Sequence, residues 1–198
     1  MSDIPRPPEF DFPLSWSGPD GIGASPFDEF AEDEGPDVDC SDGQEVAVAL
    51  RRTLGMFATG VTVITTRKGE QVHGMTANAF MSVSLEPPLV LISVDRRTKM
   101  CGLLHEGWRY GVSVLCETQS SLSDRFAGRP GDDLPQPRFD LVKDTPLVEG
   151  ALAVFVARVE RSYWGGDHSL FLGRVEYARQ GPGAPLLFHG GRYEKLGA

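Results

Sequence analysis

Small and hydroxyl-bearing side chains crowd residues 74–84, which lie between two apolar segments. Small side chains let a ligand come close to backbone N–H and C=O groups. The residues able to add side-chain hydrogen bonds here are Thr76, Asn78, Ser82 and Ser84. This composition indicates a wall for a flat heterocycle with polar edges. A strand of small residues at a tight barrel crossing would give the same pattern and remains the alternative.

Three cations, Arg96, Arg97 and Lys99, follow a predicted buried strand and open a predicted short helix. A helix start offers free N–H groups and a positive dipole end, and basic side chains add charge, so a phosphate would bind there. Basic residues at this end of a helix oppose its dipole. That opposition favours a bound anion as their explanation, with ordinary surface charge as the alternative.

Two glycines precede Asp167 and His168, between the two longest predicted strands. The glycines predict a tight turn from whose end the His168 imidazole projects. It would orient a substrate, accept a hydrogen bond or act as an acid or base. A turn histidine without a chemical role is the alternative. The sequence has no HExxH, no histidine pair at metal spacing and no cysteine cluster, so no metal site is predicted. It also lacks a GxSxG elbow.

The elements that must hold these residues are mostly strands. Apolar and β-branched runs predict strands at 61–66, 89–94, 110–115, 151–160 and 169–178, and a hairpin at 186–196. Helices are predicted from a cap at Asp42, with Glu45 three residues on, to Gly60, at 99–105, and at 122–127 opened by Ser121. The Pro-rich segment 129–145 predicts a surface loop. Many short strands with few helices indicate a barrel or a sandwich. The absence of GxGxxG and GxxxxGK[ST] argues against a Rossmann site or a phosphate loop.

Charge divides the chain near residue 44. Residues 1–44 hold 12 Asp and Glu and one Arg, a net charge of −11, whereas the whole chain carries −9. Seven prolines also interrupt residues 1–43, so we predict a disordered acidic tail there. Because the tail also contains aromatic residues, a segment that folds onto a partner or a second subunit is the alternative. Residues 44–198 are predicted to form one domain.

The body, at about +2, lacks the basic field that nucleic-acid binding needs. The longest apolar run, 151–157, is far shorter than the roughly 18 residues of a membrane span. The N-terminus has no basic and apolar regions of a secretory signal. Three widely spaced cysteines form neither a disulfide framework nor a metal motif. A reducing cytoplasm is the expected compartment.

Taken together, several stretches of the chain resemble the short-chain flavin reductase family, the reductase components of two-component flavin monooxygenases. The stretches that carry the resemblance are 57–66, 74–78, 83–89, 95–98, 122–127, 166–168 and 191–193. The resemblance covers about residues 47–196. It implies a mainly β fold, a split β-barrel that binds FMN or FAD, with a few short peripheral helices. It also implies a homodimer.

The resemblance also implies a role for each matching residue. Thr59, Gly60 and Val61 would lie near the flavin ring. The isoalloxazine and ribityl wall would comprise Thr76, Ala77, Asn78, Ala79, Ser82, Val83 and Ser84. The phosphate end would be held by Ser93, Val94, Asp95, Arg96, Arg97 and Lys99. His168 would be the catalytic residue that meets the nicotinamide, with Arg192 and Tyr193 closing the site.

The implied reaction is the reduction of FMN or FAD by NADH or NADPH, with the reduced flavin passing to a partner monooxygenase. Hydride transfer is chemistry of the cofactors, so the protein needs to stack nicotinamide on isoalloxazine at about 3–3.5 Å rather than supply an acid–base triad. Two alternatives remain open. The first is a flavin-bound oxidase or dehydrogenase that acts directly on a small organic substrate. The second is a non-catalytic flavin-binding protein.

Overall fold

The computed structural model describes residue 40 and residues 46–129 and 134–197. The predicted disordered tail, residues 1–43, therefore lies outside the described residues except for Cys40. The same holds for the expected start of the first helix, the Asp42 cap with Glu45.

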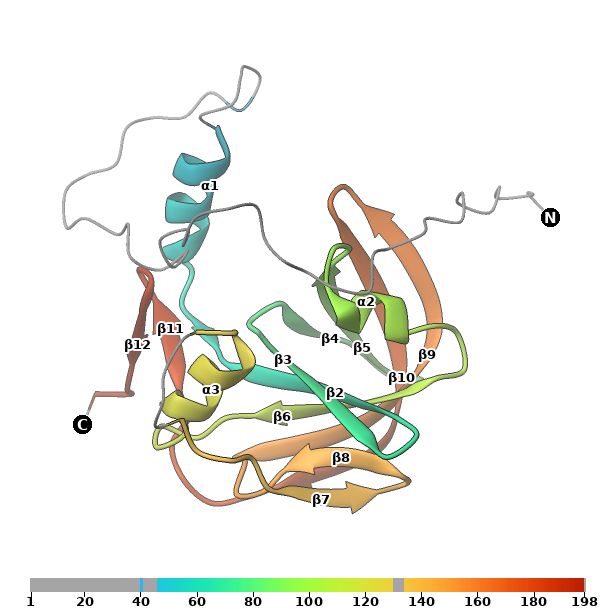
Figure 1. Ribbon diagram of the computed structural model, residues 1–198. Helices are drawn as coiled ribbons and strands as arrows, with labels where there is room; N and C mark the ends of the chain where they lie inside the picture. Colours follow the sequence, from blue (N-terminus) through green and yellow to red (C-terminus); the bar gives the residue numbers. More distant parts are fainter. Residues whose placement is uncertain (1–39, 41–45, 130–133, 198) are drawn as a thin grey trace.

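A seven-stranded antiparallel sheet dominates the fold (Figure 1), in the order β3-β2-β6-β9-β10-β5-β4. Its strands are β2 (Thr62–Lys68), β3 (Gln71–Ala77), β4 (Phe80–Leu85), β5 (Pro88–Asp95), β6 (Arg109–Val114), β9 (Ala153–Gly165) and β10 (His168–Gln180). Strands β3 and β4 are the two edges, so the barrel is split rather than closed. This arrangement confirms the mainly β fold with few short helices.

Smaller elements surround this sheet. A three-stranded sheet joins β1 (Thr59–Gly60), β11 (Leu187–His189) and β12 (Arg192–Glu194), and a hairpin joins β7 (Phe139–Val142) and β8 (Thr145–Val148). The helices are α1 (Val46–Gly55), α2 (Lys99–Leu103) and α3 (Ser120–Phe126). Helix α1 has no buried residue and projects from the body (Figure 1).

Alternation along the strands builds two hydrophobic clusters. In β2, Ile64 belongs to one cluster and its neighbour Val63 to the other, and both are fully buried. Helix α2 closes the Ile64 cluster through Met100. Helix α3 closes the Val63 cluster through Phe126. Both helices are thereby fixed against the sheet close to the predicted site residues.

Three predicted element boundaries are wrong. The first helix ends at Gly55 rather than Gly60, because Thr59 and Gly60 pair with β11 instead. Helix α3 starts at Ser120 with Gln119 at its N-cap position, not Ser121. The predicted loop 129–145 contains β7, which pairs with β8 through a turn at Lys143 and Asp144. Pairing with a distant strand decides the first boundary. The β7–β8 hairpin is local, and the prolines ahead of β7 concealed its apolar residues.

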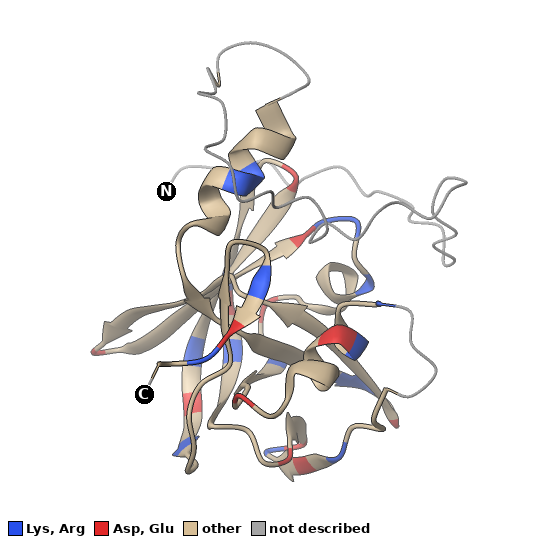
Figure 2. Ribbon diagram, turned by 90° about the vertical axis from the view of Figure 1, so that its left-hand side faces the viewer, with Lys and Arg blue, Asp and Glu red and all other residues tan. Residues whose placement is uncertain are grey.

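Charges are spread over the described part of the chain. Figure 2 shows basic and acidic residues interspersed on the strands and helices. This matches a body near neutrality. No helix among the residues described is long and apolar enough to cross a membrane.

Tyr110 carries a buried polar atom that permits a stability prediction. Its side chain is fully buried, and its hydroxyl has no hydrogen-bond partner within the described chain. Burial raises the pKa of this phenol above its usual value. Because an unsatisfied buried hydroxyl costs about 1–3 kcal/mol, Tyr110→Phe should raise the free energy of unfolding by about 1 kcal/mol at neutral pH in urea titrations. A less stable phenylalanine variant would contradict this account.

The same substitution should change the response to alkali. Above the unfolded-state pKa of about 10, the phenol ionises in the unfolded chain but stays protonated in its buried site, so ionisation favours unfolding of the unmodified protein. The stability advantage of Tyr110→Phe should therefore grow with pH above about 10.

Candidate active site

A cavity of about 110 Å³ lies where the start of β2 and the end of β3 meet α3 and the β11–β12 hairpin. The residues that line it are Val61, Thr76, Ala77, Asn78, Ser123, Ala127, Phe188 and Tyr193. Five of these were predicted site residues: Val61, Thr76, Ala77, Asn78 and Tyr193. The structure therefore brings the predicted small-residue wall together with the predicted Tyr193.

Close packing of α3 against β3 shapes this cavity. A Cβ atom at Gly74 would come within 2.4 Å of the Phe126 ring, so only glycine allows this approach. The Thr76 hydroxyl donates a hydrogen bond to the Ser123 carbonyl at 2.7 Å. These contacts hold Ser123 and Ala127 over the wall.

The floor of the cavity is a polar network around Tyr193. The Tyr193 hydroxyl oxygen lies 2.8 Å from both Ser123 Oγ and Asp124 Oδ1. With one proton, it donates to the Asp124 carboxylate and accepts from Ser123. Arg129 pairs with the same carboxylate at 2.9 Å. Burial raises the pKa of Tyr193, so the phenol stays protonated at neutral pH and the ring is held in place.

The wall continues from the cavity toward β5 and the sheet edge. The Ser93 N–H donates to the Ala79 carbonyl at 3.1 Å, which joins the β3–β4 turn to β5. Beyond the turn, Ser82 and Val83 are exposed and Ser84 is half-buried on the edge strand β4. A register shift between Ser82 and Ser84 interrupts the pairing with β5. These three residues do not line the cavity, so this side of the wall is open.

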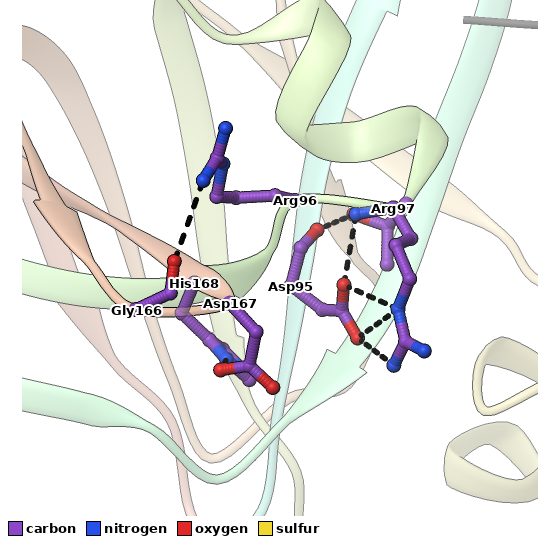
Figure 3. A network of polar contacts seen from close by, with 7 residues as sticks. Asp95, Arg96, Arg97, Gly166, Asp167 and His168 are labelled. Carbon is purple, nitrogen blue, oxygen red and sulfur yellow. Dashed lines mark hydrogen bonds and ion pairs between the residues drawn. The ribbon is translucent and has the colours of Figure 1, made fainter.

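Asp95 organises the segment that follows β5 (Figure 3). Its Oδ1 accepts from the Arg97 backbone N–H at 2.8 Å, and its Oδ2 pairs with Arg97 Nη2 at 2.7 Å. The hydrogen bond from Arg97 is the main reason that the pKa of Asp95 is lowered. The Asp95 carbonyl accepts from Thr98, which is the N-cap of α2. The turn into α2 is therefore fixed by one aspartate.

The three predicted cations take different directions. Arg96 lies over the Trp164 ring at 3.9 Å from its centroid, whereas Arg97 is paired with Asp95. Lys99 lies near His73, whose pKa is lowered by burial and further by Lys99. The charge of Arg97 is thus compensated, and α2 has only five residues to contribute a dipole.

His168 begins β10 and lies beside the Asp95 segment. It is the register partner of Asp95, and the Arg96 N–H donates to the Asp167 carbonyl at 3.0 Å. Its Nδ1 is 2.7 Å from Asp167 Oδ1, and this hydrogen bond lowers the pKa of Asp167 (Figure 3). The side chain is 40% exposed. Asp167 thus engages one ring nitrogen, and Nε2 is the nitrogen left to meet a ligand.

The remaining predicted residues lie around these two groups. The Val94 side chain is fully buried, so only its backbone is available to a ligand. The buried Thr59 hydroxyl has no hydrogen-bond partner within the described chain, and Thr59 pairs with the cavity residue Phe188. Gly60 is open, with nothing within 4 Å of a Cβ built there. Arg192 is exposed, and its Nε lies 4.0 Å from Glu194 Oε1. It is next to the cavity residue Tyr193 in the sequence but does not line the cavity.

Sequence reasoning assigned no role to three cavity residues, Ser123, Ala127 and Phe188. The first two lie in the stretch 122–127, one of those that carry the family resemblance, and that was the available signal. Phe188 precedes the glycine turn of the last hairpin and was interpreted only as part of a strand. In the described parts of the chain, no group of three or more His, Cys, Asp or Glu is placed to hold a metal ion.

The described fold is thus a split antiparallel sheet, with a cavity at one end of β2 and β3 and a histidine turn beside an arginine segment. The chain belongs to the flavin reductase family, since the family described as "Flavin reductase like domain" matches residues 54–197.

Named relatives agree with this assignment. An NADH-dependent flavin reductase of Rhodococcus sp. is 44% identical over 158 residues, which is 78% of this chain and 89% of that one. The reductase component of a Thermus thermophilus 4-hydroxyphenylacetate 3-monooxygenase is 42% identical over 149 residues, covering 75% and 95%.

Solved structures of similar proteins have the same fold. The flavin reductase PheA2 in its native state superimposes with a TM-score of 0.72 at 42% identity, covering 75% of this chain and 97% of that one. The Streptomyces globisporus NADH:FAD oxidoreductase SgcE6, in complex with NAD and FAD fragments, gives 0.72 at 40% identity, covering 82% and 97%.

Proposed function

We propose that this protein reduces FMN or FAD with NADH and passes the reduced flavin to a partner monooxygenase. The observation that carries the proposal is the cavity formed by Val61, the 76–78 wall and Tyr193, within a chain that matches the flavin reductase family over nearly all of its body. Relatives named as NADH-dependent FAD and FMN reductases support the choice of cofactors.

The residues present fit a flavin. The cavity of about 110 Å³ is smaller than the roughly 300–1,000 Å³ of a complete small-molecule site. It therefore suits one end of the ligand, while the open wall along the β3–β4 turn and β4 would carry the rest. The Thr59 hydroxyl, which has no partner among the described residues, offers a hydrogen bond beside the cavity. Thr59 to Val61, Thr76 to Ala79 and Ser82 to Ser84 would bind the flavin.

The bound cofactors supply the hydride chemistry, and the protein supplies position. His168, with Nδ1 engaged by Asp167, would direct Nε2 toward the nicotinamide. Ser93 to Lys99 would hold phosphate, and Arg97 would contribute less than its charge suggests because Asp95 compensates it. Arg192 and Tyr193 would close the far side.

We also propose a homodimer in which a second copy covers the open wall. Edge strand β4 exposes Met81, Val83 and Leu85, and Leu85 is 90% exposed. Large exposed apolar patches beside a site mark interaction surfaces. In sedimentation experiments the protein should sediment as a dimer. Leu85→Asp should shift it toward the monomer and weaken flavin binding. A single sedimenting chain in the unmodified protein would contradict this proposal.

The body beginning near Gln44 should carry the whole activity, because the acidic, proline-rich residues 1–43 lie outside the family match. A protein that begins at Gln44 should keep its thermal unfolding temperature and its rate of flavin reduction. Loss of either would make the tail structural.

All three cysteines lack a disulfide, which supports a reducing cytoplasm as the proposed location.

The function is tested by steady-state oxidation of NADH and of NADPH, with and without added FMN or FAD. A reductase oxidises NADH only when free flavin is added. An oxidase or dehydrogenase retains its flavin through purification and turns over little NADH. A non-catalytic binding protein retains flavin and oxidises neither nucleotide. Either of the last two results would replace the proposed function.

A further inference from the structure

An aromatic side chain without an assigned role lies beside the predicted phosphate segment. Trp164 is the second-to-last residue of β9, at the tip of the β9–β10 hairpin, and is 55% exposed. The Arg96 guanidinium carbon lies 3.9 Å from its ring centroid. A cation at this distance over an indole face fixes the orientation of the ring.

Arg96 is itself held by the hairpin tip. Its Nη1 donates to the Gly166 carbonyl at 3.4 Å, and its backbone N–H donates to the Asp167 carbonyl at 3.0 Å (Figure 3). Gly166 has φ +69°, a conformation that favours glycine. The tryptophan, the arginine and the turn therefore form one ordered unit.

This unit faces away from the histidine. Trp164 pairs with Ser169 and Ser169 with Val94, whereas His168 pairs with Gly165 and Asp95. Successive side chains of a strand point to opposite faces. Figure 3 likewise shows Arg96 pointing away from Asp95 and His168. The hairpin tip thus presents His168 on one face and the Arg96–Trp164 pair on the other.

We propose that Trp164, backed by Arg96, binds the adenine and adjoining phosphate of an adenine nucleotide, the shared half of FAD and NADH. This inference rests on the proposed function, since it assigns a second contact to the same cofactors. A flat indole face stacks a purine base, and arginine pairs with phosphate. Arg96 covers one indole face, and Trp164 as a residue remains 55% exposed, which leaves ring surface for a base.

The location suits either dinucleotide. Arg96 directly follows the β5 residues assigned to the flavin phosphate, so the adenylate of FAD would extend from there onto Trp164. The adenylate of NADH would reach Trp164 around the tip while its nicotinamide meets His168. FMN has no adenine and would gain nothing from the tryptophan.

The direct test is calorimetric titration of AMP into the full-length protein. AMP should bind, and Trp164→Ala should weaken it about 5- to 150-fold, the range expected for loss of one stacked base. Trp164→Phe keeps a stacking ring and should retain most of the affinity. Tyr163→Ala is the matched control, since Tyr163 is the exposed neighbour on the other face, and it should leave AMP binding unchanged.

Two further comparisons identify the source of the adenylate. If it is FAD, Trp164→Ala should weaken FAD and spare FMN. If it is NADH, the variant should raise the KM for NADH and spare reduced nicotinamide mononucleotide. AMP binding requires no turnover, so this result can be read even if the reductase function fails. Absence of AMP binding, or unchanged AMP affinity in Trp164→Ala, would overturn the proposal. So would a variant that alters only the sedimenting mass, which would assign Trp164 to a contact between copies.

Discussion

Replacing His168 by alanine should lower kcat/KM for NADH about 5- to 150-fold, because the loss of one hydrogen bond to the nicotinamide nucleotide costs roughly 1–3 kcal/mol. The flavin dissociation constant should change much less. His168 begins β10, directly after the β9–β10 turn, and is absent from the cavity lined by Asn78 and Tyr193. The expected effect is thus on the nucleotide that donates hydride.

The measurement pairs flavin titration with NADH kinetics in the same preparation. Asp167→Asn is the matched variant, because it keeps the imidazole and removes only the carboxylate that engages Nδ1. It should show a smaller kinetic loss than His168→Ala. Unchanged NADH kinetics in His168→Ala would leave the histidine without a chemical role. A loss of flavin affinity as large as the kinetic loss would place it on the other ligand.

Gly74→Ala should both destabilise the protein and damage flavin binding. The new Cβ would lie 2.4 Å from a carbon of the Phe126 ring, so the ring or the α3 backbone that carries it must shift. Overpacking of this kind costs about 1–3 kcal/mol. A shifted α3 breaks the 2.7 Å hydrogen bond from Thr76 to Ser123, which shapes the cavity. We expect about tenfold weaker flavin binding, equivalent to about 1.4 kcal/mol.

Gly102→Ala is the control for this substitution. Gly102 lies in α2, and a Cβ built there meets nothing within 4 Å. Alanine should stabilise the helix by about 0.5–1 kcal/mol relative to glycine and leave flavin binding unchanged. If Gly74→Ala behaved like Gly102→Ala in urea unfolding and in flavin titration, the packing of α3 on β3 would not define the site.

The strands β2, β5, β6, β9 and β10 were predictable because their side chains carry the signal locally, whereas β3, β4, β7 and β8 were not predicted. The β-branched run in β2 and the alternation of Val90, Ile92 and Val94 in β5 are visible in the sequence, and both segments form strands. Boundaries set by pairing at a distance were not predictable. Gly60 extends β1 because Leu187 pairs with it, and no residue near Gly60 announces that partner.

The site residues also divide into those with a local signal in the sequence and those brought together only by strand pairing. Small residues at 76–78 indicated a ligand wall, and they line the cavity. The juxtaposition of Asp95 with His168 arises from the pairing of β5 with β10, which joins segments about 70 residues apart and leaves no local trace. Trp164 was missed because it lies beyond the predicted strand 151–160, and only its exposure and its contact with Arg96 distinguish it.

The central claim, that this chain moves hydride from NADH to a flavin, is tested most directly by anaerobic rapid mixing. The protein with bound FMN or FAD is mixed with an equimolar amount of NADH, and the absorbance bands of flavin and NADH are followed together. We predict that both bands are lost at the same rate, much faster than without protein, and that oxygen restores only the flavin band. Flavin that stays oxidised with both NADH and NADPH, in protein shown to be folded and to hold flavin, would contradict the account.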